Sequence, residues 1–298
     1  MELKLLRSMW GAPEGPAALV EHVVEMGLDG VEGPPPADAA GRAGLRRRLD
    51  DAGLVFVAEA CTGRPRPRMG EPAAERWWMA HPGAGPERHL EDLRAAVEAA
   101  QEMDALLVSG LTGFDAWPRE VSAGYLRSLA ALAADAGVAV TAETHRGRSL
   151  FNPWITEVLL DDAPALELTC DFSHWCVVAE RRIDSEIEIV RKAARRCRHL
   201  HGRVGWAQSA QVADPRDPAH AEDLAAHERW WGLCWDAQEA RGFGVTTMTV
   251  EFGPDGYLPV LPFTRQPVAD LNCVIRWMAD RQRERFAART PTLPFRSP

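Results

Sequence analysis

Eight short apolar segments alternate with longer segments of helical periodicity from one end of the chain to the other, and this repetition restricts the fold more than any other feature. We predict strands over 3–9, 30–32, 54–60, 105–109, 138–143, 166–171, 199–203 and 245–251. We predict helices over 16–26, 37–51, 87–103, 119–136, 153–161, 177–197, 221–241 and 266–288. Alternation of this kind indicates successive βα units that build a parallel sheet.

Eight βα units without a break in composition predict a single (β/α)₈ TIM barrel over residues 1–298. A hydrophobic content of 46% supplies enough apolar residues for one large core. An open, doubly wound sheet is the alternative architecture, but no G-x-G-x-x-G phosphate loop follows any predicted strand. The C-terminal ends of barrel strands meet on one face, so residues that end different strands would share one site.

Residues 61–86 and 203–220, together with the C-terminal tail, do not belong to the repeat. Residues 203–220 follow the strand that bears His201, and their position favours substrate contact. Residues 61–86 form a connection after the third predicted strand that is too long for a simple βα loop. We interpret this connection as a substrate lid, an ordered surface loop or a subunit contact. Residues 281–298 form a basic C-terminal arm, which we interpret as a solvated tail or an oligomer contact.

Charge, cysteine content and hydropathy indicate which partners and which compartment to expect for this protein. The net charge of −9 argues against a general nucleic-acid-binding surface, since phosphate binding relies on a basic field. Six cysteines without a C-x-x-C pair indicate buried thiols in a reducing compartment. The first residues lack a signal-peptide pattern, and no apolar run reaches the roughly 18 residues of a membrane span. We therefore expect a cytoplasmic protein that binds neither nucleic acid nor a membrane.

Acid or imidazole side chains end four consecutive predicted strands: Glu143, Asp171, His201 and Glu251. A single strand-end carboxylate is more often solvated or salt-bridged than a metal ligand, but four such residues in consecutive barrel units favour a shared metal site. Three carboxylates and one imidazole form a mainly hard oxygen set, which favours Mn²⁺ or Mg²⁺ and tolerates Co²⁺ or Zn²⁺. We predict one divalent metal ion, with Mn²⁺ in first place.

Other polar and aromatic residues stand beside these strand ends. Arg203 has the strand parity of His201, and we expect it to bind a substrate oxygen or to steady a ligand carboxylate. His199, by contrast, is expected to face the helix layer and to be structural. Glu59 ends the third predicted strand, where it would orient a partner or form a buried ion pair. Three indoles beside strand ends are predicted to pack against a sugar ring: Trp10, Trp175 and Trp206.

Each predicted ligand lies in a short motif: Thr-Ala-Glu143-Thr-His, Asp171-Phe-Ser-His174, His199-Leu-His201 and Glu251-Phe-Gly. These motifs resemble those of the xylose isomerase-like TIM barrels, a superfamily of sugar and sugar-phosphate isomerases and epimerases, inosose and dehydroshikimate dehydratases, and apurinic endonucleases. The resemblance implies that the same four residues hold the metal and that His174 contacts the substrate. It also implies, as a looser assignment, that Arg203 reaches the substrate.

The resemblance is incomplete for the endonuclease branch. Those enzymes build a three-metal site with further histidines at the ends of strands two and three and a D-x-H motif after strand seven. This chain has Glu32 and Glu59 near those strand ends, and Asp214-Pro-Arg216 where the D-x-H motif would be expected. A three-metal centre would lack ligands, which argues against DNA cleavage.

The ligand set and the resemblance together lead us to expect a metal-dependent isomerase or epimerase of a keto-sugar. Glu143 and Glu251 come from strands on opposite sides of the other two ligands, so they could flank the substrate. One would remove the proton next to a metal-bound carbonyl to give an enediolate, and the other would return it.

Two other classes of function stay open. A lyase or dehydratase on the same scaffold would act on an inosose-, dehydroshikimate- or keto-glycoside-type substrate, because these reactions share the first proton abstraction. A non-catalytic metal or sugar binder, or the barrel subunit of a hetero-oligomer, would use the same fold without the chemistry. The expected ligand is a small sugar or polyol-like molecule, and the resemblance implies a homo-oligomer, either a dimer or a tetramer.

Overall fold

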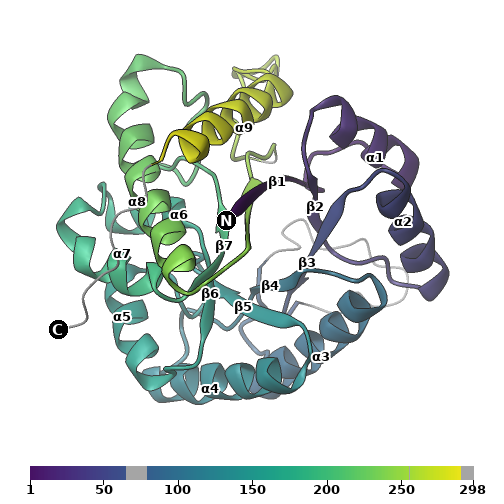
Figure 1. The fold of residues 1–298 in the computed structure, drawn as a ribbon. Helices are drawn as coiled ribbons and strands as arrows, with labels where there is room; N and C mark the ends of the chain where they lie inside the picture. Colours follow the sequence, from purple (N-terminus) through teal and green to yellow (C-terminus); the bar gives the residue numbers. More distant parts are fainter. Residues whose placement is uncertain (65–78, 255, 290–298) are drawn as a thin grey trace.

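A computed structural model describes residues 1–64, 79–254 and 256–289 of the chain. Its strands form a closed barrel in sequence order, with neighbouring strands parallel and β8 paired back to β1 (Figure 1). They are β1 (Glu2–Ser8), β2 (Gly30–Gly33), β3 (Val55–Cys61), β4 (Leu107–Leu111), β5 (Ala139–Glu143), β6 (Glu167–Cys170), β7 (Cys197–His201) and β8 (Val245–Val250). The predicted (β/α)₈ TIM barrel is confirmed.

Helices cover the outside of the barrel (Figure 1). They are α1 (Pro16–Glu25), α2 (Ala39–Asp51), α3 (Pro86–Glu102), α4 (Arg119–Asp135), α5 (Pro153–Asp162), α6 (Phe172–Ala179), α7 (Ile187–Ala194), α8 (Ala221–Ala240) and α9 (Leu271–Ala288), with 3₁₀ turns η1 (Asp184–Glu186) and η2 (Pro218–His220). Proline occupies the first turn of α1, α3 and α5, where the backbone N–H groups have no partner within the helix. None of the helices in the described ranges has both the length and the hydropathy of a membrane span.

The single helix predicted over 177–197 is wrong, because two helices occupy this part of the chain. α6 begins directly after Asp171, whose side chain accepts a hydrogen bond from the backbone N–H of Ser173. It ends at Glu180, whose left-handed φ of 54° breaks the helix, and α7 starts only at Ile187. The early start of α6 places Ser173 and His174 beside the end of β6.

The interior of the barrel is layered. Toward the N-terminal ends of the strands, Leu6, Val57 and Leu107 form a small apolar cluster, separate from the larger core between strands and helices. A hydroxyl layer follows along the barrel axis, in which the Thr169 Oγ1 atom lies 3.0 Å from Ser109 Oγ and 2.7 Å from Thr141 Oγ1. Since alternate residues of a strand point into the barrel, the next inward layer lies at the C-terminal strand ends.

The connection after β3 and the C-terminal arm are described only in part. A long connection does join β3 to α3, but residues 65–78 lie outside the described part of the chain, so the lid remains a prediction. The predicted C-terminal arm begins within α9, where the Arg281 Nε atom lies 2.5 Å from Oε1 of Glu228 on α8. Residues 290–298 of the arm are also outside the described residues.

Gly30 on β2 leads to a prediction about stability. A Cβ atom on Gly30 would overlap the carbonyl oxygen of Val55, a backbone atom that cannot move without shifting β3. We expect Gly30→Ala to lower the free energy of unfolding by about 1–3 kcal/mol in urea denaturation. Gly44→Ala is the matched control, because a Cβ atom there meets nothing within 4 Å and alanine favours the helix. Equal stability of the two variants would contradict the predicted overlap.

Candidate metal centre and pocket

The four predicted ligands converge at the C-terminal mouth of the barrel. Glu143 ends β5, Asp171 follows β6, His201 ends β7 and Glu251 follows β8. Each offers one ligand atom, and these atoms all lie within 4.8 Å of one another. The His201 Nδ1 atom lies 2.9 Å from Glu251 Oε2, 3.3 Å from Glu143 Oε1 and 3.8 Å from Asp171 Oδ2.

Several polar atoms of this group are buried without a hydrogen-bond partner in the described structure. They are both carboxylate oxygens of Glu143, Nδ1 of His201 and Oε2 of Glu251. Buried carboxylates are costly unless a hydrogen bond or a cation compensates them, so four converging acceptors fit a divalent metal ion. The pKa of His201 reflects the same excess of negative charge. Burial lowers the pKa of His201, but Glu251, Glu32 and Glu143 outweigh this effect and raise it well above its ordinary value.

Glu32 on β2 orients the His201 ring. The Nε2 atom of His201 lies 3.1 Å from Glu32 Oε2, so an Nε2–H donated to this carboxylate leaves Nδ1 free to bind a metal. His199 also reaches Glu32, with its Nε2 atom 3.3 Å from Oε2, and its Nδ1 atom lies 2.7 Å from Thr247 Oγ1. The expectation that His199 faces the helix layer is therefore wrong, because residues two apart on a strand share a face.

Arg203 holds two of the ligand carboxylates. Its Nη2 atom lies 2.5 Å from Asp171 Oδ2 and 3.2 Å from Glu251 Oε2. The same nitrogen donates to Nε2 of His174 at 2.7 Å. Burial lowers the pKa of His174 well below its ordinary value, with further lowering from His145 and Arg203, so a neutral ring accepts this hydrogen bond. Of the two roles expected for Arg203, the structure displays the contact with ligand carboxylates.

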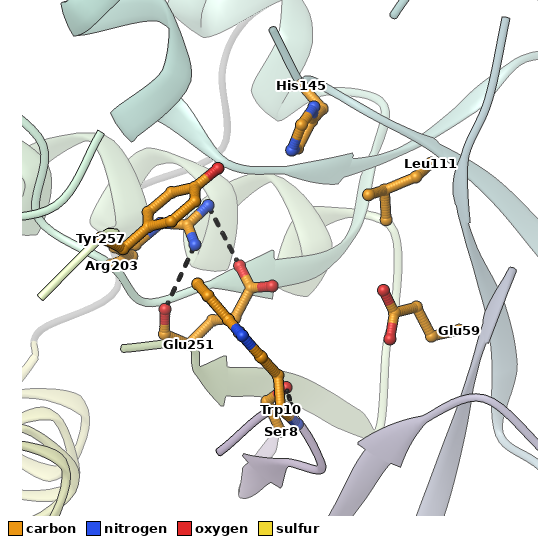
Figure 2. A pocket seen from close by; sticks show the side chains of 8 residues that line it. All are labelled: Ser8, Trp10, Glu59, Leu111, His145, Arg203, Glu251 and Tyr257. Atoms are coloured by element: carbon orange, nitrogen blue, oxygen red, sulfur yellow. Dashed lines mark hydrogen bonds and ion pairs between the residues drawn. The ribbon is translucent and has the colours of Figure 1, made fainter. Parts of the chain in front are cut away.

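A small cavity opens beside Glu251, one of the four predicted ligands (Figure 2). Its lining consists of Ser8, Trp10, Glu59, Leu111, His145, Arg203, Glu251 and Tyr257. Trp10 packs edge-on against Tyr257 with ring centroids 4.9 Å apart, and the Arg203 guanidinium lies 4.9 Å from the Tyr257 ring centroid. The cavity therefore combines aromatic faces with fixed charges, as small-molecule sites do.

The three indoles predicted to pack against a sugar ring lie at different places in the structure. Only Trp10 of the three lines this cavity. Trp175 is fully buried, and its Nε1–H donates to the carbonyl oxygen of Leu150, so its predicted role against a sugar ring is corrected to core packing. Trp206 lies at a separate surface cavity beside Arg181 and Arg182, which corrects its placement as well.

His174 is fully buried, and the centroid of its ring lies 3.8 Å from the centroid of the His145 ring.

Glu59 differs from the other carboxylates at the mouth. Its hydrogen bond in the described structure comes from the Cys61 thiol, with Sγ and Oε1 3.4 Å apart, and no ion pair to Glu59 occurs among the described residues. The expected buried ion pair is thus not found there. Burial raises the pKa of Glu59 to about 8, with further contributions from Glu32, Glu251 and Glu143.

Tyr257, like Ser8 and Leu111, lines the cavity but was not among the predicted site residues. It follows Glu251 by six positions, and Gly256, with a φ of 82°, turns the chain just before it. The signal available in the sequence was a rare residue, one of two tyrosines, in the Gly-rich loop after the eighth strand.

A family model described as "Xylose isomerase-like TIM barrel" matches residues 20–226 of the chain. Among solved structures, the chain is similar to 3-keto-D-glucoside 4-epimerase YcjR from E. coli, with 15% sequence identity and a TM-score of 0.57 over 95% of this chain and 99% of that chain. It is similar to the probable 3-DHS dehydratase AsbF from Bacillus anthracis, with 13% identity and a TM-score of 0.56 over 94% and 98% of the two chains.

A third similar structure is a xylose isomerase-like TIM barrel protein from Mycobacterium smegmatis in complex with magnesium. It shares 14% identity with a TM-score of 0.61 over 93% of this chain and 94% of that chain. Likenesses at these identities show the fold alone. A comparison with curated proteins gave no match.

The convergence of the four ligands predicts a metal content. We expect about one divalent ion per wild-type chain by mass spectrometry after dialysis, and its loss in Glu143→Ala and Asp171→Ala, because each variant removes one ligand. Glu59→Gln is the matched control, since Glu59 lies at the same mouth but outside the ligand group. Metal retained in both ligand variants, or several ions per chain, would contradict a mononuclear centre.

The raised pKa of Glu59 predicts how stability depends on pH in metal-free protein. The unfolded carboxyl loses its proton near its ordinary pKa of 4.5, whereas the folded one keeps it up to about 8. The folded state thus binds more protons in this interval, so Glu59 lowers stability as the pH rises from about 5 to about 8. Urea denaturation should show Glu59→Gln gaining stability relative to wild type across this range. A constant difference, like that expected for the exposed control Glu188→Gln, would refute the assignment.

Proposed function

We propose that this chain, which belongs to the xylose isomerase-like TIM barrel family, is a divalent-metal-dependent isomerase or epimerase of a keto-sugar. The observation that carries the proposal is the group of buried ligand atoms from Glu143, His201 and Glu251 that have no hydrogen-bond partner in the described structure, beside a cavity that Glu251 lines. Structural neighbours named as an epimerase and a dehydratase support a sugar or polyol-like substrate.

Glu143, Asp171, His201 and Glu251 would hold the metal ion in this proposal. Bound there, a divalent ion would polarise the substrate carbonyl and make the adjacent C–H bond more acidic. The mainly oxygen ligand set supports Mn²⁺ or Mg²⁺, and the neighbour named as a magnesium complex agrees with this choice.

Two carboxylates would move the proton. Glu143 on β5 and Glu251 after β8 stand on opposite sides of Asp171 and His201, because the strands are arranged in sequence order. One carboxylate would take the proton from the carbon next to the carbonyl, and the other would return it. Return to the opposite face of the same carbon is epimerisation, and return to the neighbouring carbon is isomerisation.

The remaining lining residues would bind and orient the sugar. Arg203 would donate to a substrate oxygen from the pocket side, while His174 and Asp171 keep its guanidinium in place. Trp10 and Tyr257 would supply apolar ring faces for the sugar carbons. Arg203 and Tyr257 would contact the sugar from the same side of the cavity, because the guanidinium lies 4.9 Å from the ring centroid.

A lyase on the same scaffold is the second candidate function. Epimerisation and isomerisation need two proton-transfer groups, whereas expulsion of an oxygen substituent also needs an acid for the departing group. The cavity has a third carboxyl group, Glu59, outside the ligand set. That observation supports elimination as the second candidate, because Glu59 could supply the acid.

Proton exchange in D₂O tests the proposed function. We expect Mg²⁺-loaded protein to exchange a C–H proton of a 3-keto-D-glucoside for deuterium, followed by NMR, and to lose this activity with EDTA. Glu251→Gln should slow exchange by about 10²–10⁴-fold, because it removes a proton acceptor. Glu188→Gln, an exposed change of the same chemistry, should have no effect. Failure of metal-replete protein to exchange any of a panel of keto-sugars would contradict the proposal.

A further inference from the structure

We propose that Glu59 is the general acid of a β-elimination, in which it protonates the oxygen that leaves the substrate. The substrate class of this pocket is then a ketone with an oxygen substituent on the β-carbon, such as a keto-glycoside. This inference rests on the proposed function, because the elimination begins with proton abstraction at the same centre.

The position of Glu59 suits this role. Its carboxyl group points into the cavity from β3, across from Arg203 and Tyr257 (Figure 2). Glu251 lines the same cavity, so a proton acceptor and Glu59 face one bound molecule from different strands. Glu59 does not belong to the group of four ligand atoms, so binding of a metal would leave its carboxyl group free to contact the substrate.

The surroundings of Glu59 favour its protonated form. Arg203 lies within 3.2 Å of both Asp171 and Glu251, whereas no cationic group in the described ranges pairs with Glu59. The titratable groups around it are Glu32 on β2, Cys61 on β3, Glu143 on β5 and Glu251 at the end of β8. Burial and the three carboxylates raise the pKa of Glu59, whereas the hydrogen bond from the Cys61 thiol lowers it by less.

The proposed step is balanced in atoms and electrons. A carboxylate, Glu251 or Glu143, takes the proton from the carbon next to the carbonyl, and the C–H electron pair becomes an enolate. That electron pair then forms the C=C bond as the C–O bond to the β-carbon breaks. The departing oxygen keeps the C–O electron pair and takes the proton of Glu59. The products are an enone and water or an alcohol, with Glu59 left as a carboxylate.

Leaving-group dependence tests the role of Glu59. Two probes serve for Mg²⁺-loaded protein: methyl and p-nitrophenyl 3-keto-β-D-glucopyranoside, which lose their C1 substituent after abstraction at C2. Methoxide is a poor leaving group that needs a proton, whereas p-nitrophenolate leaves without one. We expect Glu59→Gln to slow methanol release by about 10²–10⁴-fold and p-nitrophenol release by less than about tenfold. Deuterium exchange at C2, measured in the same NMR experiment, should persist in the variant.

A pH profile provides a second readout that a structural role would not move. Wild-type methanol release should fall as the pH rises and Glu59 ionises, and Glu59→Gln should lack this descending limb. Thermal melting of both proteins verifies that the variant folds. Glutamine is nearly isosteric with a protonated glutamic acid and carries no charge, so we expect the variant to melt no lower than wild type.

The outcomes separate this inference from the proposed function. Exchange at C2 without release of either leaving group would overturn the elimination and leave the isomerase or epimerase intact. Equal slowing of both probes in Glu59→Gln would overturn the acid role of Glu59. Absence of exchange and release in the metal-loaded wild type would overturn the proposed function itself.

Discussion

Parallel pairing between β1 and β8 closes the barrel through six registered residue pairs, from Glu2 opposite Val245 to Arg7 opposite Val250. The four candidate ligands come from neighbouring strands and would be close even in an open sheet. The contacts that complete the centre are different, because they cross the barrel. Glu32 on β2 reaches His201 on β7, and Glu59 on β3 faces a cavity shared with Glu251 after β8. Closure therefore converts a row of ligands into an enclosed site.

Charge at the mouth is distributed unevenly. Asp171 and Glu251 share one guanidinium, and Glu32 is held by two imidazoles. Glu143 has neither kind of partner for its oxygens beyond the nearby His201 ring. A site with more carboxylates than cations favours either a metal ion or a bound proton. In the candidate centre the ligand group would favour the metal ion, and burial together with the nearby carboxylates favours the proton on Glu59.

Periodicity and strand-end chemistry were sufficient to predict the barrel and the grouping of the four ligands. Both follow from backbone rules: parallel strands end on one face, and a polar residue that ends a buried strand points to the mouth. The sequence pattern did not predict which individual side chains face the cavity and which pack in the core. Trp175 and Trp10 both follow strand ends, but the indole of Trp175 is buried within α6, whereas that of Trp10 faces the cavity beside Tyr257. Tyr257 reaches the cavity through a turn whose path the sequence pattern does not encode.

The apolar cluster of Leu6, Val57 and Leu107 closes the barrel on the side opposite the cavity. Its three side chains are almost entirely buried, so they seal the lower end against water. Ions, water and organic molecules must then enter and depart through the same opening. Binding would then be ordered: a metal ion at the base of the cavity would have to bind before the organic molecule that covers it, and a product would have to leave before the ion could dissociate.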